Sequence, residues 1–201
     1  VEVHGAHGYL LDQFLWNGVN ERNDEYGGDA VRRAQFAVDV IGAIRRSISS
    51  DFPLILRISQ WKQQDYTARL AASPEELSAI FKPIADAGVD IFHCSQRRWW
   101  EPEFAGSDLN LAGWIKRLLN RPTITVGSVG LASEMSVTNL DETAVPEFDL
   151  APLAARLRAG EFDLVAVGRA LLADPQWVES VRTGDTSKIR RFDKSALDEL
   201  H

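Results

Sequence analysis

The chain has 201 residues, of which 45% are hydrophobic and 25% are charged, so it can form one ordinary globular domain with a sizeable core. Its formal net charge of −7 argues against nucleic acid or an anionic membrane as the main partner. A single cysteine, Cys94, excludes a disulfide framework within the chain and any zinc or iron–sulfur site built from several thiolates. We expect a reducing, cytoplasmic setting and no membrane span.

The first predicted elements are a strand, a helix and a second strand. Residues 1–4 already form a strand, without an initiator methionine, so we expect a fragment or a chain that lacks an upstream half. Residues 30–48 predict a helix because apolar side chains recur at helical spacing from Phe36 to Ile48. Residues 54–58 are almost continuously apolar, which is typical of a parallel sheet covered on both faces.

The rest of the chain continues this alternation of strands and helices. Ser73, Pro74 and Glu76 indicate a helix start with a capping box, and Gly88 indicates the end of that helix. Asp174 and Pro175 indicate the start of a final helix. Between these points we predict strands at 90–94, 123–126 and 162–167, and helices at 109–119 and at 150–158, the latter ended by Gly160.

Five strands alternating with helices predict a parallel α/β sheet, which is either doubly wound or a (β/α)8 TIM barrel. Polar or glycine residues follow one strand end after another, which is the habit of the barrel. A doubly wound sheet concentrates its chemistry at one switch point. Since a full barrel has eight strands, we predict a single domain over residues 1–201 that forms only part of one. The residues at the strand ends are His4, Arg57, Ser95, Gly127 and Gly168.

Two histidines and a tyrosine follow the first strand, in the run from His4 to Tyr9. The imidazoles of His4 and His7 could bind a metal or donate two hydrogen bonds to one oxygen, and Tyr9 is a candidate proton donor. The metal interpretation requires a third ligand, and none is obviously placed nearby. Without a function, His4 would pack under a turn and Tyr9 would be half-buried. The two glycines in the run and its place at a strand end favour a functional site, and we predict no metal.

The run of residues 1–15, followed by residues 20–28, resembles the fourth strand and the following loop of the Old Yellow Enzyme family of flavin oxidoreductases. The resemblance covers essentially the whole chain and implies barrel strands 4 to 8. It implies FMN as cofactor, NAD(P)H as electron donor and an α,β-unsaturated carbonyl compound as substrate. It further implies that His4 and His7 hold the carbonyl oxygen of the substrate and that Tyr9 gives a proton to its α-carbon. In the loop, the resemblance makes Arg22, Asp24, Tyr26 and the paired glycines structural rather than catalytic.

Arg57 lies inside an apolar strand, where a guanidinium is costly without a partner. One interpretation is a structural salt bridge, for instance to Glu2. The resemblance instead implies that Arg57 lies beside the flavin ring, where a fixed positive charge stabilises the anionic reduced flavin. The order of the strands favours the flavin role.

Glycine turns follow the last two predicted strands, at Gly127–Ser128 and at Gly168–Arg169. Glycine lets backbone N–H groups approach a phosphate closely, and arginine supplies a forked, permanently charged donor. TIM barrels often build a phosphate site from the loops after strands seven and eight. The pattern therefore predicts an FMN phosphate site, and the resemblance implies the same role for Gly168 and Arg169.

The loop after the third strand contains Arg97, Arg98, Trp99 and Trp100. The tryptophans could wall a substrate pocket over the flavin, and the arginines could meet the phosphate of a nicotinamide cofactor. Alternatively, the loop packs its tryptophans on the barrel rim, and the sequence leaves both interpretations open. Cys94 shows no sign of an activated thiolate, so we expect it to be a buried small apolar residue.

The sequence therefore predicts an FMN-dependent oxidoreductase that uses NAD(P)H to reduce the C=C bond of an α,β-unsaturated carbonyl compound. Two alternatives remain: an enzymatically inactive fragment of such a barrel, and a metal-dependent barrel hydrolase that uses His4 and His7. The partner is a small molecule, and a homo-oligomer is left open. Since the family's first three strands carry further flavin contacts, we expect this chain to need the N-terminal half of the barrel.

Overall fold

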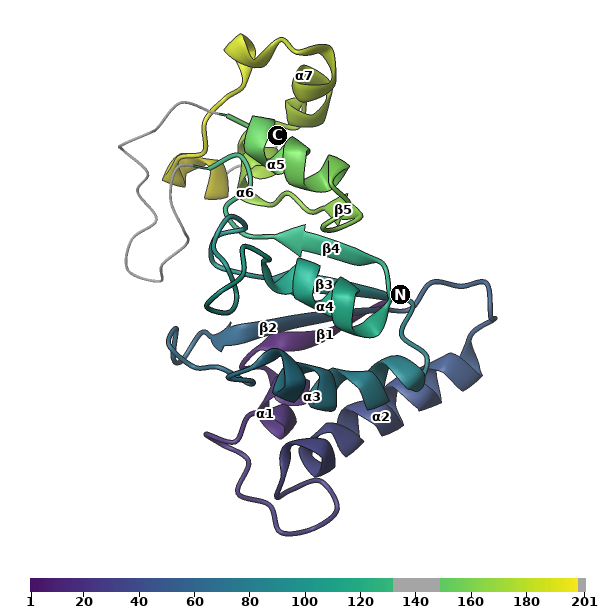
Figure 1. Ribbon diagram of the computed structural model, residues 1–201. Coiled ribbons are helices and arrows are strands. Elements are labelled where there is room, and N and C mark those ends of the chain that lie inside the picture. The colour runs from purple at the N-terminus through teal and green to yellow at the C-terminus, as the bar shows by residue number, and fades with distance from the viewer. Residues whose placement is uncertain (132–148, 199–201) are drawn as a thin grey trace.

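The computed structural model describes residues 1–131 and 149–198. It contains one five-stranded sheet in which sequential strands are neighbours and all pairs are parallel (Figure 1). The predicted parallel α/β sheet is therefore confirmed. The strands are β1 (Glu2–His7), β2 (Ile55–Lys62), β3 (Ile91–Ser95), β4 (Thr123–Val126) and β5 (Leu164–Val165).

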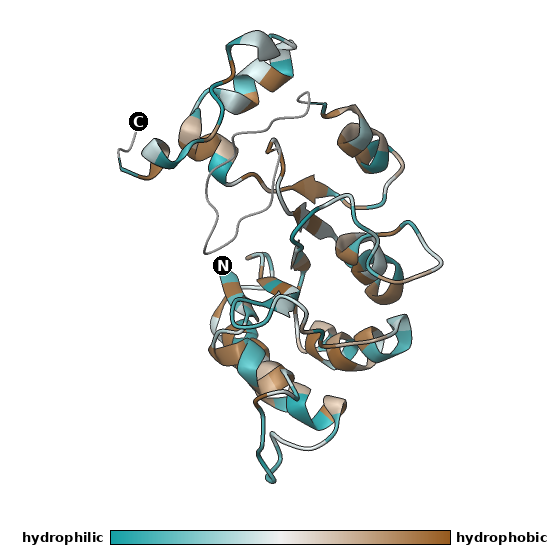
Figure 2. Cartoon of the chain, turned by 90° about the vertical axis from the view of Figure 1, so that its left-hand side faces the viewer, coloured by the Kyte–Doolittle hydropathy of each residue, from teal (hydrophilic) through white to brown (hydrophobic). Residues whose placement is uncertain are grey.

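The helices that connect these strands lie along one face of the sheet (Figure 1; right-hand side of Figure 2). Right-handed crossovers between strands in sequential order place every connecting helix on the same side. Neighbouring helices pack on each other, α2 on α3 and α3 on α4. These helices are α2 (Ala30–Ser47), α3 (Pro74–Asp86), α4 (Leu111–Leu119) and α5 (Ala151–Arg158).

The core lies between the sheet and these helices. Leu56 pairs in register with Phe92 and Ile58 with Cys94, so the four side chains share the face that the helices cover. All four are buried, and they pack in one cluster with the apolar side of α3 and α4. Cys94 is the buried apolar residue that we expected, and its burial raises the pKa of the thiol.

The other face of the same strands carries polar side chains. His4 pairs in register with Arg57, and Arg57 with His93, so these residues form a row across β1, β2 and β3. Because side chains alternate along a strand, this row points away from Leu56 and Phe92. The second face of the sheet is therefore polar rather than apolar.

Several predicted elements are confirmed with small shifts of their ends. Helix α2 is capped by Asp29, whose carboxylate accepts from the backbone N–H of Val31 and Arg32. In α3, the Ser73 hydroxyl accepts from Glu76 N, but the Glu76 carboxylate accepts from Ala72 N rather than from Ser73 N. The glycines predicted to end helices, Gly88 and Gly160, both have positive φ.

Other elements differ from the prediction. Strand β2 runs four residues beyond the predicted end at residue 58, whereas β5 is shorter than the predicted 162–167. The short helices α1 (Leu10–Leu15) and α6 (Arg169–Ala173) were not predicted. The last α-helix, α7 (Trp177–Thr183), begins after Gln176, so the predicted start at Asp174–Pro175 lies too early. The Asp174 carboxylate accepts from Gln176 N and so stabilises a turn before the helix instead. Short 3-10 helices follow at Thr186–Lys188 and Lys194–Leu197.

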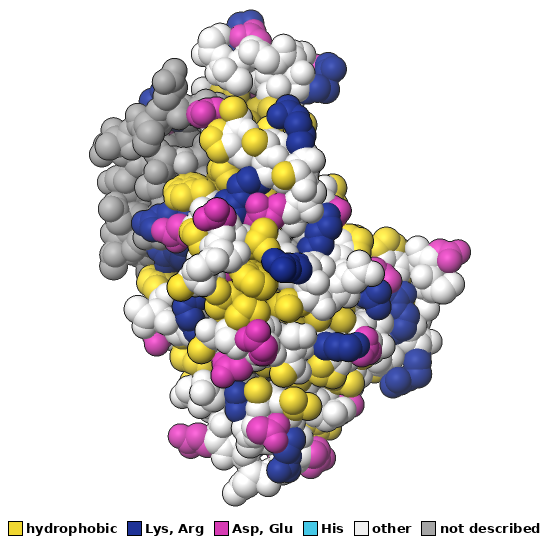
Figure 3. All heavy atoms as spheres, viewed as in Figure 1, with side chains coloured by type: hydrophobic (Ala, Val, Ile, Leu, Met, Phe, Trp, Pro, Cys, Tyr) yellow, Lys and Arg dark blue, Asp and Glu magenta, His cyan; other side chains and the backbone are white. Residues whose placement is uncertain are grey.

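Cationic and anionic side chains are interspersed over the helix-covered face, with no large area of one sign (Figure 3). None of the helices in the described ranges combines the length and the apolar character that crossing a membrane requires.

Candidate active site

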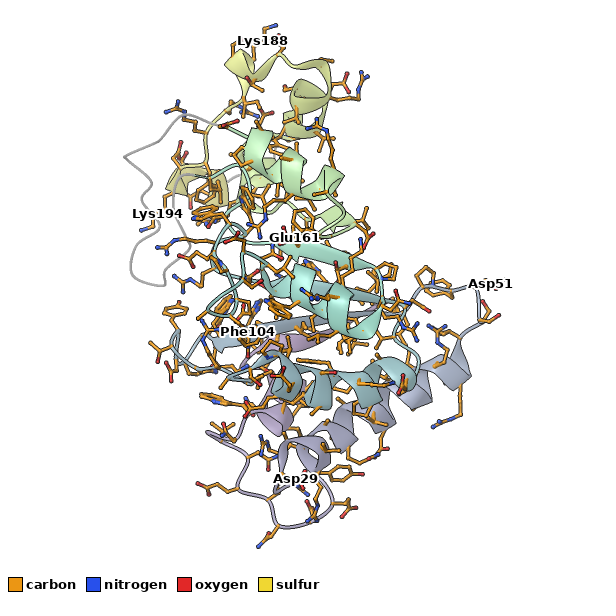
Figure 4. All side chains as sticks on the ribbon, viewed as in Figure 1. Asp29, Asp51, Phe104, Glu161, Lys188 and Lys194 are labelled. Carbon is orange, nitrogen blue, oxygen red and sulfur yellow. The ribbon has the colours of Figure 1, made fainter. Side chains whose placement is uncertain are left out.

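The carboxyl ends of the parallel strands lie along one edge of the sheet, on the left in Figure 1. Phe104, in the loop after β3, lies toward this edge, and Asp51, before β2, lies at the opposite end (Figure 4). Loops at this edge carry the residues that the sequence predicts for the site. In barrels of parallel strands, this is the edge where catalytic residues gather.

His4, His7 and Tyr9 lie together at the end of β1. The ring centroids of His4 and His7 are 5.3 Å apart, and those of His4 and Tyr9 are 5.2 Å apart. The structure thus brings together the three side chains that the sequence singled out. Tyr9 is 48% exposed and so is half-buried, as the non-functional interpretation also expects, and its hydroxyl donates to Gln63 Oε1 at 3.2 Å.

A sharp turn separates the two histidines from the tyrosine. His7 and Gly8 both have left-handed backbone conformations, with φ of 64° and 81°. A side chain at Gly8 would meet only the flexible end of the exposed Gln64, so it is the positive φ rather than lack of space that favours glycine here. The turn places Tyr9 at the N-terminal end of α1.

His7 is held by residues from β2 and β3 that the sequence did not assign to the site. Its Nε2 lies 2.8 Å from Ser95 Oγ, and its ring stacks on Trp61 with centroids 4.4 Å apart. Its backbone N–H donates to Ser59 Oγ at 2.9 Å. Ser95 was visible in the sequence only as a polar residue at a strand end, and Trp61 and Ser59 gave no signal because β2 extends further than predicted.

Both histidines are neutral near pH 7. Burial and the nearby Arg57 guanidinium lower the pKa of His7 to about 3, with His4 contributing further. The same two causes lower the pKa of His4, although Glu2 opposes the shift. A neutral imidazole can donate from one nitrogen and accept at the other. The pair can therefore polarise a bound oxygen by hydrogen bonding rather than by a full positive charge.

Arg57 does not form the salt bridge to Glu2 that the structural interpretation proposed. The Glu2 carboxylate is instead 3.0 Å from His93 Nδ1. Arg57 Nε is buried and has no hydrogen-bond partner among the described residues. Burial lowers the pKa of Arg57, with the Glu2 carboxylate opposing the shift. A buried cationic donor of this kind fits an acceptor supplied by a bound group.

The backbone of Gly127, in the loop after β4, packs closely against the loop after β3. A Cβ at Gly127 would lie 2.5 Å from the backbone oxygen of Gln96, and the φ of Gly127 is 157°. Ser128 also has a positive φ, of 51°, and its hydroxyl donates to the backbone oxygen of Arg97 at 3.0 Å. This hydrogen bond links the loop after β4 to the loop after β3.

The loops after β4 and β5 lie side by side. A Cβ at Gly130 would come within 3.2 Å of the Ala170 side chain in α6. No atom of residues 1–131 or 149–198 lies within 4 Å of the point where a side chain at Gly168, just before α6, would project. Arg169 lies with its guanidinium carbon 5.4 Å from the centre of the Phe192 ring. The predicted phosphate-binding residues therefore belong to adjacent loops.

A cavity of about 340 Å³ lies between the loops after β2 and β3. Its lining includes Trp61, Tyr66, Ser95, Arg97 and Glu103, so it borders the residues that contact His7. The Arg97 guanidinium carbon lies 3.9 Å above the Tyr66 ring centre and 5.5 Å from that of Trp61. Burial raises the pKa of Glu103 to about 7, although Arg69 opposes the shift.

Neither Trp99 nor Trp100 lines this cavity. Trp99 is buried and packs in the core, as the rim-packing interpretation expects. Arg97 lines the cavity, whereas Trp100 is 40% exposed and lies outside its lining. Arg98 pairs with Glu101 at 2.5 Å.

The metal interpretation of His4 and His7 requires more ligands. Within residues 1–131 and 149–198, no group of three or more His, Cys, Asp or Glu side chains is arranged to hold a metal ion.

Comparison with known proteins gives a family match over most of the chain. A sequence profile of the NADH:flavin oxidoreductase / NADH oxidase family matches residues 1–187. The chain is 34% identical over 199 residues to an NADH oxidase of Thermoanaerobacter brockii, covering 95% of this chain and 27% of that protein. It is 33% identical over 183 residues to an NADPH dehydrogenase of Clostridium acetobutylicum, covering 90% of this chain and 48% of that protein.

A cinnamate reductase of Clostridium sporogenes is 29% identical over 210 residues, covering 94% of this chain and 29% of that protein. The chain therefore spans about half or less of the length of the curated relatives described here.

Proposed function

The chain belongs to the NADH:flavin oxidoreductase / NADH oxidase family, the Old Yellow Enzymes, and on this basis we propose that it forms the substrate-binding part of an FMN-dependent oxidoreductase. The enzyme uses NAD(P)H to reduce the C=C bond of an α,β-unsaturated carbonyl compound. The observation that carries the proposal is the cluster of His4, His7 and Tyr9 at the end of β1, beside Arg57 on β2.

We also propose that β1 to β5 are strands 4 to 8 of a (β/α)8 barrel, with residues 1–201 as one partial-barrel domain. Two observations support this fold. The strand order is sequential with helices on one face, whereas a doubly wound sheet reverses its order and has helices on both faces. The opposite face carries His4, Arg57 and His93 in register, and in a closed barrel this face would line the interior. The N-terminal half of the barrel would come from elsewhere in the protein.

FMN fits the residues that this chain provides. The unsatisfied Nε of Arg57 suits an acceptor on the flavin ring, and the positive charge favours the anionic reduced form. Gly127 and Ser128 would approach the phosphate from the loop after β4, and Gly168 and Arg169 from the loop after β5. The open space at Gly168 supports this assignment because a phosphate needs close approach to the backbone. Bound FMN would supply the hydride-transfer chemistry.

The protein's own groups would handle the substrate. His4 and His7 hydrogen-bond its carbonyl oxygen, so that negative charge developing on this oxygen is stabilised. Being neutral, they do so without placing two further positive charges beside Arg57. The hydroxyl of Tyr9 gives its proton to the α-carbon. The cavity bordered by Trp61 and Tyr66 would receive the remainder of the substrate.

The alternative of an inactive fragment is favoured by one observation, the short span of the chain relative to its relatives. Absorbance spectroscopy of the purified chain, alone and within the complete protein, tests both possibilities. We expect the complete protein to carry stoichiometric FMN that NAD(P)H reduces and cyclohex-2-enone reoxidises. A complete protein without flavin would refute the proposed function. Stoichiometric FMN with enone turnover in the 201-residue chain would refute the inactive-fragment alternative.

A further inference from the structure

A fully buried ion pair lies directly behind the turn that carries His7 and Tyr9. Lys62 Nζ is 2.8 Å from the carboxylate of Asp12, and both side chains are 0% exposed. Taking two charges out of water costs several kcal/mol per ion, and such a pair is often replaceable by apolar residues. Neither Asp12 nor Lys62 has a part in the proposed chemistry, so stability and catalysis do not by themselves explain why a buried ion pair stands at this position.

The pair joins the helix that follows the turn, α1, to strand β2, which lies beside β1 in the sheet. Asp12 lies in α1, just after the turn, and Lys62 is the last residue of β2. Lys62 pairs in register with His7 across the two strands. The ammonium group also donates to the backbone oxygen of Ser59 at 3.3 Å, which fixes it to β2.

The carboxylate of Asp12 reaches the turn itself. Asp12 Oδ2 accepts from the backbone N–H of Gly8 at 2.7 Å, and this hydrogen bond is buried. His7, on one side of Gly8, has a left-handed backbone that is unfavourable for a residue with a side chain. Such a conformation persists only where surrounding contacts impose it. The Asp12–Gly8 hydrogen bond is such a contact.

We infer that Asp12, held in place by Lys62, is a positioning residue that fixes the His7–Tyr9 turn so that the imidazole and the phenol face the same substrate. The inference rests on the proposed function of His7 and Tyr9. Burial raises the pKa of Asp12 and lowers that of Lys62, and in each case the partner's charge opposes the shift. Since the loss of one charge would strand the other, the test replaces both together.

Two double variants differ only in the acceptor that they offer to Gly8. Asp12→Asn with Lys62→Met removes both charges but keeps a side-chain oxygen near the Gly8 N–H. Asp12→Leu with Lys62→Met removes both charges and the acceptor. Because neither leaves a lone buried charge, both should fold. Lys116→Met is the matched control, since Lys116 pairs with Asp163 at 2.8 Å on α4, outside the proposed site.

Two readouts separate positioning from a general loss of structure. The first is hydrogen exchange of the Gly8 amide in the flavin-free protein. The second is the pair of half-reactions in the FMN-loaded complete protein, reduction by NADPH and reoxidation by cyclohex-2-enone. In the variant with Asp12→Leu and Lys62→Met, called the Leu/Met variant, we expect the Gly8 amide to exchange faster. Reoxidation of the flavin should be slower by about tenfold or more, since small misplacements of reacting groups have effects of this size. The variant with Asp12→Asn and Lys62→Met is called the Asn/Met variant. Flavin reduction should be unchanged, and the Asn/Met and Lys116→Met variants should keep both readouts near their original values.

A further comparison measures whether the effect of the Leu/Met change on reoxidation depends on the Tyr9 hydroxyl. In a Tyr9→Phe background, the Leu/Met change should slow reoxidation less than it does with Tyr9 present, because residues that act as a unit are not additive. Equal slowing of both half-reactions, full additivity with Tyr9→Phe, or equal behaviour of the two double variants would overturn the inference. If Tyr9→Phe alone leaves reoxidation unchanged, the proposed function fails together with this inference. If Tyr9→Phe slows it while the Leu/Met variant does not, this inference alone fails.

Discussion

His7 Nε2 lies 2.8 Å from Ser95 Oγ, so a hydrogen bond links the first strand of the sheet to the third across β2. The contact buries the imidazole of His7 and fixes its ring against Trp61. It also occupies one ring nitrogen, which leaves the other for a ligand. This arrangement favours the neutral form of the His7 imidazole. It also determines that the second ring nitrogen, rather than Nε2, is the one that can bind a substrate.

We predict that His7 stays neutral over the physiological range, because burial and Arg57 lower its pKa to about 3. NMR titration of histidine-labelled protein, assigned with a His7→Asn variant, should show ring signals of His7 that do not move between about pH 5 and 8. A titration midpoint between about pH 6 and 7 would contradict the burial argument.

The same shift predicts how His7 affects stability. In the unfolded chain its pKa returns to about 6.5, so between this value and the folded pKa of about 3 the unfolded state binds more protons. The contribution of His7 is therefore fully present above about pH 6.5 and is lost as the pH falls, by at most about 1.4 kcal/mol per pH unit. Denaturant unfolding of the parent and of His7→Asn should converge in acid if this is correct.

We predict that Gly168→Ala weakens FMN binding. A methyl group at Gly168 meets open space in the flavin-free chain, but it would occupy room that the phosphate needs. The dissociation constant for FMN, measured by quenching of flavin fluorescence in the complete protein, should rise by about tenfold, as expected when a charge-assisted hydrogen bond is lost. Gly168 has φ of −109° and ψ of −98°, outside the regions that residues with a side chain favour, so we expect the melting temperature of the flavin-free protein to fall as well.

Gly42→Ala, on helix α2 and away from the site, is the control for the added methyl group. It should leave FMN affinity unaltered. Equal affinity for FMN in Gly168→Ala and the parent would remove Gly168 from the phosphate site.

We predict that Tyr66→Leu changes substrate preference. Its ring stacks against the Arg97 guanidinium and lies 5.7 Å from the Trp61 ring, at the wall of the cavity beside His7. Contacts of this kind are worth about 0.5–1.5 kcal/mol, so kcat/KM for cinnamaldehyde should fall by about twofold to tenfold relative to but-2-enal. Trp100→Leu, on an exposed residue outside the cavity lining, should leave the ratio unchanged. An unchanged ratio in Tyr66→Leu would show that the substrate does not enter this cavity.

Much of the fold could be predicted because its signals are local. The apolar periodicity of α2 and the cap of α3 at Ser73 lie within one or two helical turns of sequence. The short helices α1 and α6, of six and five residues, show no such periodicity, and each is shorter than two turns. Strand β2 continues through Ser59, Gln60 and Lys62 because these polar side chains find buried partners, for example the backbone N–H groups of Leu70 and Ala71 for Gln60.

The candidate site divides in the same way. His4, His7 and Tyr9 stand out because they share one short motif after a strand. Ser95 is 88 residues from His7 in sequence, and Lys62 is 50 residues from Asp12, so these partnerships depend on strand register. The predicted salt bridge from Arg57 to Glu2 is wrong for a related reason, because the sequence does not show that a third strand brings a competing partner. Glu2 and Arg57 do lie on one face of neighbouring strands, but His93 on β3 takes the carboxylate.

The most direct test of the account is Tyr9→Phe in the FMN-loaded complete protein, with the two half-reactions followed separately by stopped-flow absorbance. This substitution removes only the hydroxyl group of Tyr9 and keeps the aromatic ring that lies beside His4. If Tyr9 supplies the proton, reoxidation of the reduced flavin by cyclohex-2-enone should slow by about 10²-fold or more, the usual effect of losing a general acid. Reduction of the flavin by NAD(P)H should remain nearly unchanged. Unchanged rates of both half-reactions would contradict the assignment of His4, His7 and Tyr9 as the substrate side of a flavin site.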